Sequence, residues 1–493
     1  MGEVNAMNGD NGRLPTAVKV GYGAPQFGEF VGITMFAMWS MFFFTDVAGL
    51  SAAFAGIISG LSTVWDGLID PQIGMWTDNR DPKKGRRRPF LLASAILFPV
   101  ILWLLYTDFN LGPFWSMVYF TLLLFMHKTT HALLDIPYTA LGAEITKNYD
   151  ERSSLNSIRN FFGAIGALMT ASTMLLAVAW FGGIFGGERA GWSATVAVFA
   201  LLSAISIHHG WRTTRGYEQK TVTTRERVRY RDYIDVLKNR SFRYITAMFA
   251  VSNIAFALSN VVAVYWLVYT LEMSDEKISL LMLVFWVASM FWVPVLNWLS
   301  HRFTKKLAWN LAMLVWACSC IVFPLMIITG PGPSTFTWLL VFVVFLQMGQ
   351  TAQFQCSWAM IPDSVEVDEF ETGRRREGVY YACVSFIQKF AMAIAYLIGG
   401  FMLTWVGYDP SVELSSETLT GIAYLFALGQ SIPLLITYLI GLFYPVNRDN
   451  HSALRRALEL KKRGEPFSDD GFRNLLSKEY RAAHLPGTGG TDA

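Results

Sequence analysis

The chain has 493 residues, of which 53% are hydrophobic, 15% are aromatic and only 16% are charged, and its mean hydropathy is +0.35. These values exclude an ordinary soluble globular protein, and a net charge of +3 is too small to indicate nucleic acid as a partner. The four cysteines lie inside apolar runs and lack the spacing of a metal site: Cys318, Cys320, Cys356 and Cys383.

Twelve apolar runs are near the length that an α-helix needs to cross a bilayer, about 20 residues. They predict an all-α membrane protein with twelve transmembrane helices. The polar N-terminal segment has no short apolar core followed by a small-residue cleavage site, so we expect no cleaved signal peptide, which fits a bacterial inner-membrane protein. The runs cover residues 28–48, 52–76, 89–107, 113–137, 156–181, 191–211, 243–271, 278–300, 305–329, 335–361, 379–407 and 418–445.

The basic residues predict how these helices are oriented. Lys and Arg concentrate in alternate connections and in the tail, whereas the opposite connections carry only Arg189 and Lys277. Cytoplasmic loops of membrane proteins show such an excess, so we expect both termini in the cytoplasm and an even number of spans. The basic segments are 77–89, 146–155, 212–242, 301–306, 362–378 and 446–493.

The order of features repeats loosely on the two sides of the central basic loop. Asp135-Ile136-Pro137 and Ile361-Pro362-Asp363 each end an apolar run and precede a charged loop and a helix with one cation, Arg159 or Lys389. Two such halves are the pattern of an alternating-access transporter, and chance similarity is the alternative. The predicted parts are a cytoplasmic N-terminal segment 1–27, a six-helix half 28–211, a cytoplasmic loop 212–242, a six-helix half 243–445 and a cytoplasmic tail 446–493.

Carboxylates lie within the first two predicted helices. Glu29 is at the start of the first, where it faces either a central cavity or the inner surface. Asp66 and Asp70 are four residues apart in the second, about one helical turn or 6 Å from each other. A charged side chain costs about 2.5–3.5 kcal/mol at the bilayer centre on insertion scales, so this pair is a candidate functional site.

Predicted helix four carries His127, His131 and Asp135 at intervals of four residues, which places them on one face. Histidine titrates near physiological pH, so both histidines are candidates for a proton path, and His131 also for solute contact. The alternative is that they are neutral packing groups. Arg159 on helix five and Lys389 on helix eleven are available as counter-charges for the carboxylates; the alternative is an ion-pair network that only stabilises the bundle.

Amide side chains cluster in predicted helix ten, and Gln353 is our candidate for solute binding among them. Amides suit the recognition of hydroxyl-rich solutes, but hydrogen bonds between helices explain them equally well. The sequence contains no nucleotide-binding loop, nucleophile elbow or HExxH motif, so nothing indicates an enzyme.

These residues together resemble the glycoside–pentoside–hexuronide:cation symporter family, the melibiose-permease-like branch of the major facilitator superfamily. The resemblance extends over residues 20–445 and implies the major facilitator fold with no resident cofactor. The matching segments are Tyr22-Gly23, Phe27-Gly28-Glu29, Thr45-Asp46-Val47-Ala48-Gly49-Leu50, Trp65-Asp66-Gly67-Leu68-Ile69-Asp70-Pro71, Asp135-Ile136-Pro137, Lys389 and Val406-Gly407-Tyr408.

The resemblance implies that Asp66 and Asp70 bind the coupling cation and that Lys389 lies near them. It also implies that Asp135 and Arg159 contact the solute. Glu29 is similar in position to the family's sugar-binding acid on helix one.

Two positions differ from the family's sodium-binding member. Where that protein has an amide before the second aspartate and a hydroxyl three residues before the helix-four aspartate, this chain has Ile69 and Ala132. A hard cation needs several oxygen ligands. We therefore favour H⁺ over Na⁺ as the coupling ion, with sodium at Asp66 and Asp70 as the alternative and no other metal site.

We therefore expect a cation-coupled symporter of a sugar, glycoside or sugar acid that works by alternating access, as a monomer among membrane lipids. The alternative solute is a lysolipid or another amphiphile. The alternative from another functional class is a membrane receptor or scaffold that does not transport.

Overall fold

The computed structural model describes residues 14–80, 86–146, 148–217, 230–328 and 335–484. All regular secondary structure in these ranges is helical, which confirms the predicted fold class. Eleven helices there are long and apolar enough to cross a membrane. A further helix of spanning length, α7 (Pro113–Ile145), is not among these eleven, and it carries the polar stripe of His127, His131 and Asp135.

The first span comprises α2 (Thr16–Gly23), α3 (Pro25–Thr34), η1 (Met35–Trp39), α4 (Ser40–Phe42) and η2 (Phe43–Val47), of which η1 and η2 are π-helical. The other long helices are α5 (Ala52–Asp78), α6 (Arg88–Leu105), α8 (Tyr149–Phe185), α9 (Glu188–Thr213), α11 (Arg240–Tyr265) with η4 (Trp266–Thr270), α12 (Asp275–Arg302), α13 (Lys305–Ile328), α14 (Thr335–Thr372), α15 (Glu377–Trp405) and α16 (Ser416–Leu442). The shorter helices are α10 (Tyr230–Val236), α17 (Arg448–Arg463), η5 (Arg473–Leu475) and α18 (Lys478–His484).

The first helix begins at Thr16, earlier than the predicted run at residue 28. Lys19 lies in this extra part, and its Nζ is 2.9 Å from a carboxylate oxygen of Glu151 on α8. The same carboxylate accepts a hydrogen bond of 2.9 Å from the backbone N–H of Leu14. A polar contact distant in sequence therefore anchors a turn that hydropathy alone does not indicate.

Short polar signals set the ends of several helices. The Ser51 hydroxyl accepts a hydrogen bond from the backbone N–H of Phe54 at the start of α5, and the Asn148 side chain caps α8 in the same way. Gly186 ends α8 with φ of +84° and Gly464 ends α17 with φ of +73°, a conformation that favours glycine.

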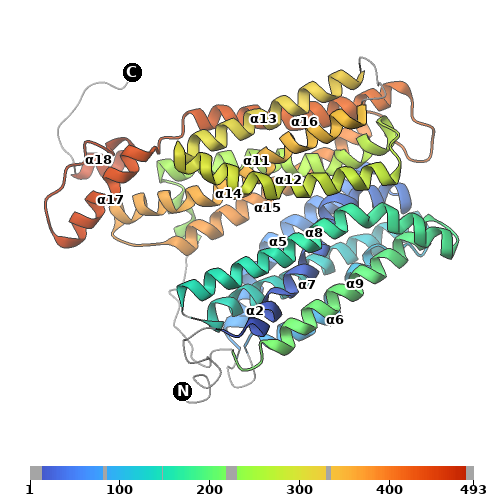
Figure 1. The fold of residues 1–493 in the computed structure, drawn as a ribbon, viewed down its shortest axis with the longest axis horizontal. Coiled ribbons are helices and arrows are strands. Elements are labelled where there is room, and N and C mark those ends of the chain that lie inside the picture. The colour runs from blue at the N-terminus through green and yellow to red at the C-terminus, as the bar shows by residue number, and fades with distance from the viewer. Residues whose placement is uncertain (1–13, 81–85, 147, 218–229, 329–334, 485–493) are drawn as a thin grey trace. The chain divides into compact units, whose positions relative to one another are not determined.

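The chain forms two compact units, each described here by itself. In the first unit, α3 packs against α8 and α9, α6 against α7 and α9, and α5 against α7 (Figure 1). In the second unit, α13 packs against α14, and α14 also contacts α17. The first unit consists of residues 1–224, 257–283 and 392–425, and the second of 225–256, 284–391 and 426–493. The division at residues 211 and 243 into two six-helix halves stays a prediction.

Within the first unit, α5 approaches the end of α15 very closely. A Cβ atom at Gly56 would lie 2.7 Å from the carbonyl oxygen of Tyr396 and 2.8 Å from the Cα of Gly400. Neither neighbour is the flexible end of a side chain, so only glycine fits at this crossing.

We predict that Gly56→Ala lowers the thermal unfolding midpoint of the purified protein. Alanine normally stabilises a helix interior by about 1 kcal/mol relative to glycine, but here its methyl group would overpack the crossing at a cost of about 1–3 kcal/mol. The matched control is Gly183→Ala in α8, where an added Cβ meets no atom within 4 Å. If Gly56→Ala stabilised the protein as much as the control does, this helix contact would be wrong.

Candidate solute and coupling site

The polar stripe of α7 lies in the first unit and has neighbours on both sides. His127 is buried and its ring stacks on Phe98 with 5.4 Å between ring centroids. One turn along, His131 Nε2 lies 3.8 Å from a carboxylate oxygen of Glu29 on α3. One turn further, Asp135 accepts a hydrogen bond of 2.9 Å from the Thr139 hydroxyl. The spacing in the sequence predicted that these residues form one stripe. In the structure, this stripe reaches two other groups of polar residues.

We call the first group the solute cluster: Glu29, His131, Asp135 and Arg159. Glu29 is buried and interacts electrostatically with Asp135 and Arg159. Arg159 on α8 donates a hydrogen bond of 3.2 Å to the Thr139 hydroxyl, which itself donates to Asp135. The cluster thus combines acidic acceptors with one permanently charged donor, the groups that bind hydroxyl-rich or anionic solutes.

Two atoms of the solute cluster have capacity for a further ligand. Glu29 Oε2 and Arg159 Nε are buried, and neither has a hydrogen-bond partner within the described ranges. Leaving a buried charged group without its hydrogen bonds costs free energy. An acceptor and a donor are therefore available in one cluster.

Two tyrosines support this cluster, and the sequence alone did not show their pairing. The Tyr138 hydroxyl donates a hydrogen bond of 2.6 Å to the carbonyl oxygen of Tyr22, and the two ring centroids are 5.0 Å apart. The Arg159 guanidinium lies 5.6 Å from the centre of the Tyr138 ring. Gly142 leaves room for the Tyr22 hydroxyl, since a Cβ there would overlap it. The resemblance had singled out Tyr22, but no sequence signal pointed to Tyr138 or Gly142.

We call the second group the coupling cluster: Asp66, Asp70 and His127. Asp66 is buried on α5 and interacts electrostatically with His127 on α7. The two helices are joined nearby by a hydrogen bond of 2.9 Å from the Trp65 indole to the Thr129 hydroxyl.

Asp70 lies one turn further along α5 and is half-buried. Pro71 follows it inside the helix and has no N–H to donate to the Gly67 carbonyl. The carboxylates of Asp66 and Asp70 and the Gly67 carbonyl thus supply oxygens that could hold a cation here.

Two predicted site residues belong to the second unit, namely Lys389 on α15 and Gln353 on α14. Lys389 is half-buried, and its relation to Asp66 and Asp70 stays a prediction. Gln353 is 0% exposed, and neither its amide nitrogen nor its amide oxygen has a hydrogen-bond partner among the residues described.

The basic connection between α5 and α6 is anchored by buried ion pairs. Arg86 donates a hydrogen bond of 3.0 Å to Asp78, and Arg87 contacts Asp78 as well. Arg87 Nε also lies 3.3 Å from the carboxylate of Glu144, near the end of α7. These bonds hold the C-terminal end of α7 close to the C-terminal end of α5. Residues 81–85 of this connection lie outside the described ranges.

A carboxylate at the other end of the first span is bound by three hydroxyl groups. Asp46 accepts hydrogen bonds from Thr45, from Tyr269 and, at 2.7 Å, from Tyr408. Tyr265 adds a hydrogen bond of 2.8 Å to Thr45. Burial first, and then the charge of Asp46, raise the pKa of Tyr408, so its hydroxyl keeps its proton and stays a donor. The resemblance had singled out the segment Thr45–Leu50 and, separately, Tyr408, but the sequence did not show that they pair.

Comparison with known proteins assigns this chain to a family. Residues 21–448 match the family described as "MFS/sugar transport protein". The chain is 28% identical to the uncharacterized symporter YnaJ of Bacillus subtilis, over 91% of this chain and 95% of that protein. It is 24% identical to the isoprimeverose transporter of Lactiplantibacillus pentosus, over 88% and 90% of the two chains.

Among solved structures, the nucleoside transporter NupG has a similar fold. The TM-score is 0.61 at 11% sequence identity, and the alignment covers 87% of this chain and 100% of that one. The predicted major facilitator fold is therefore confirmed.

We predict that Tyr408→Phe lowers the thermal unfolding midpoint, because it removes one donor from a largely buried carboxylate. Hydrogen bonds to charged groups contribute about 1.5–3 kcal/mol. Tyr424→Phe serves as the control, since that side chain is 46% exposed on α16. Equal midpoints for the two variants would show that the Asp46 contact contributes nothing to the folded state.

Proposed function

The chain belongs to the MFS/sugar transport protein family, and from that premise we propose that it is a cation-coupled symporter of a sugar, glycoside or sugar acid. It is an integral membrane transporter and not an enzyme. We place it in the plasma membrane, as a bacterial inner-membrane protein, with both termini in the cytoplasm. We also propose that it acts as a monomer.

One observation carries this proposal: the stripe on α7 connects the solute cluster with the coupling cluster. His131 approaches Glu29, and His127, one turn away, interacts with Asp66. A symporter needs two sites whose occupancies are linked, because the bound ion must change the affinity for the solute. A single helix that contributes side chains to both clusters supplies a direct physical link.

In the solute cluster, we assign hydroxyl recognition to Glu29 and Asp135. The unpartnered oxygen of Glu29 can accept a hydrogen bond from a sugar hydroxyl, and Arg159 can donate to a sugar oxygen or to the carboxylate of a sugar acid. His131 adds a donor or acceptor beside Glu29. We keep Gln353 as a candidate for solute binding, since its buried amide has no hydrogen-bond partner among the described residues.

In the coupling cluster, we assign ion binding to Asp66 and Asp70. A proton neutralises one carboxylate and removes the cost of a buried negative charge, which requires no further oxygen ligands. Ile69 and Ala132 supply none, so we favour H⁺ over Na⁺. We keep Lys389 as a further candidate for a role in coupling. His127 and His131 would pass the proton along α7.

The Asp46 hydrogen bonds support an alternating-access cycle. Within the first unit they join the end of the first span to η4 and to the α15–α16 connection. We propose that these bonds close one side of the transporter and break when that side opens.

We predict that adding the correct solute to proteoliposomes makes the outside solution more alkaline, with the same amplitude in the presence and absence of sodium. The measurement is the external pH while glycosides, sugar acids and lysolipids are added in turn. A response that required sodium would overturn the preference for protons. A response to lysolipids alone would favour the amphiphile alternative.

We further predict that variants of the two clusters fail in different ways. Asp66→Asn should keep exchange of labelled for unlabelled solute but lose accumulation driven by the ion gradient. Arg159→Ala should lose both, because it removes the charged donor of the solute cluster.

Arg152→Ala on the same helix is the matched control for Arg159, since Arg152 is exposed and contacts only backbone oxygens in the described ranges. If Arg159→Ala transported as well as Arg152→Ala, the solute assignment would be wrong. If no variant and no wild-type protein exchanged any solute, a receptor or scaffold role would remain.

A further inference from the structure

The second unit contains a small basic cavity at one end of its helices. The cavity has a volume of about 170 Å³ and lies where α12 ends, α13 begins and α16 passes into α17. This volume is below the roughly 300–1,000 Å³ of pockets that enclose a drug-sized ligand, so the cavity suits a small group. Five basic side chains and one carboxylate line it: His301, Lys305, Lys306, Arg448, His451 and Asp363.

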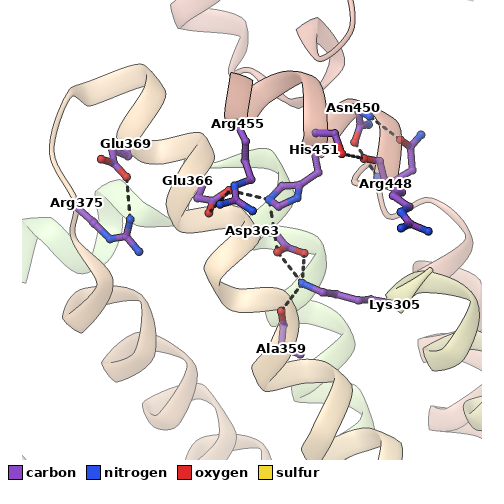
Figure 2. Close-up of polar contacts among 12 residues, drawn as sticks. Lys305, Ala359, Asp363, Glu366, Glu369, Arg375, Arg448, Asn450, His451 and Arg455 are labelled. Atoms are coloured by element: carbon purple, nitrogen blue, oxygen red, sulfur yellow. Dashed lines mark hydrogen bonds and ion pairs between the residues drawn. The ribbon is translucent and has the colours of Figure 1, made fainter. Parts of the chain in front are cut away.

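The carboxylate neutralises only part of this positive charge. Lys305 reaches Asp363 from the start of α13, with Nζ–O distances of 2.7 and 2.9 Å (Figure 2). His451 lies 3.6 Å from Asp363 and 2.8 Å from Glu366. Lys306 instead donates to the backbone oxygens of Leu442 and Tyr444 at 2.8 and 2.9 Å, so its charge has no carboxylate partner there.

Arg448 is the second cation without a carboxylate partner in the described ranges. Its side chain donates a long hydrogen bond of 3.4 Å to the backbone oxygen of His301. Arg448 also begins α17, just as Lys305 begins α13, so the positive ends of two helices add to the charge of the side chains. The cavity therefore attracts an anion.

A buried hydroxyl group in the cavity wall has no partner of its own. Tyr444 lines the cavity and is 3% exposed, and its hydroxyl has no hydrogen-bond partner among the residues described. Burial first, and then the charge of Asp363, raise the pKa of Tyr444 well above its ordinary value, so the hydroxyl stays protonated. It is thus a neutral donor on a residue that lines the cavity together with Lys306 and Arg448.

The surroundings of the cavity are apolar and are formed by the ends of membrane-spanning helices. Phe303 lines the cavity and is 46% exposed. Leu307 on α13 and Leu442 and Phe443 at the end of α16 are exposed as well. Large exposed side chains at this position suit contact with acyl chains. The basic segments 301–306 and 446–493 are those that we expect on the cytoplasmic side.

We propose that this cavity binds the phosphate group of an anionic phospholipid from the cytoplasmic leaflet. Lys306, Arg448 and the Tyr444 hydroxyl hold the phosphate oxygens, and the acyl chains lie along Phe303, Leu442 and Phe443. Basic pockets between transmembrane helices on the cytoplasmic side commonly bind such headgroups. The inference does not depend on which solute the protein transports.

The test is the thermal unfolding midpoint of delipidated protein in a nonionic detergent, titrated with phosphatidylglycerol or with phosphatidylcholine. A ligand that binds only the folded state raises this midpoint as its concentration increases. We expect a saturable rise with phosphatidylglycerol and none with phosphatidylcholine. Arg448→Gln should require about five-fold more phosphatidylglycerol, the effect of one basic residue near an anionic headgroup.

Two further variants distinguish a binding site from general surface charge. Tyr444→Phe should be neutral or stabilising without lipid, because it removes a buried hydroxyl without a partner, yet it should gain less from phosphatidylglycerol than the wild type does. Arg456→Gln makes the same charge change as Arg448→Gln on an exposed position of α17 outside the cavity wall, and should titrate like the wild type.

The source of the phosphate is tested with inorganic phosphate and glycerol phosphate. If these raised the midpoint as much as phosphatidylglycerol and lost the effect in the same variants, the lipid assignment would be overturned in favour of a soluble phosphate. If all variants responded equally to phosphatidylglycerol, or if no phosphate compound stabilised the wild type, the site itself would be overturned.

Discussion

The cost of placing charged groups inside a bilayer determines how the first unit is built. A charged residue at membrane depth must be paired, hydrated or neutralised. Glu29 and Asp135 satisfy this demand through Arg159 on α8, and α7 places the histidines of the polar stripe beside Glu29 and Asp66. Because these partners come from several helices, the helices must keep their register for the charges to remain compensated. The polar residues that weaken α7 as a membrane span therefore also determine which helices it contacts.

The sequence predicted the spans and the polar stripe well because both depend on local patterns. Hydropathy places both ends of most helices within three residues, and intervals of four place His127, His131 and Asp135 on one face. The helices that extend well beyond their apolar runs are the first span, α7, α8 and α14. The sequence was less informative about contacts between residues that are distant along the chain. The start of the first span depends on Glu151, and the Asp46 carboxylate is bound by Tyr269 and Tyr408, more than two hundred residues away. No periodicity reveals such contacts in a single sequence.

Similar anchors occur at corresponding places in the two units. Near the end of α7, Glu144 binds Arg87, which precedes α6. In the last third of α14, Asp363 binds Lys305, which begins α13. Both α7 and α14 contain an internal proline, Pro137 and Pro362. In each unit, therefore, a long helix with a proline is held by an ion pair to the start of the helix before it.

The π-helical segment η1 of the first span changes the angle between Glu29 and Asp46 about the helix axis. A π segment accommodates one extra residue, so it rotates everything beyond it by about 100° relative to an uninterrupted α-helix. The first segment lies wholly between the two residues, so it turns Asp46 by about 100° around the axis relative to its position in an unbroken helix. The number of residues between Glu29 and Asp46 is therefore constrained, because it sets the directions in which the two side chains point. Deleting one residue within Met35–Trp39 would regularise the helix and turn Asp46 away from its tyrosines.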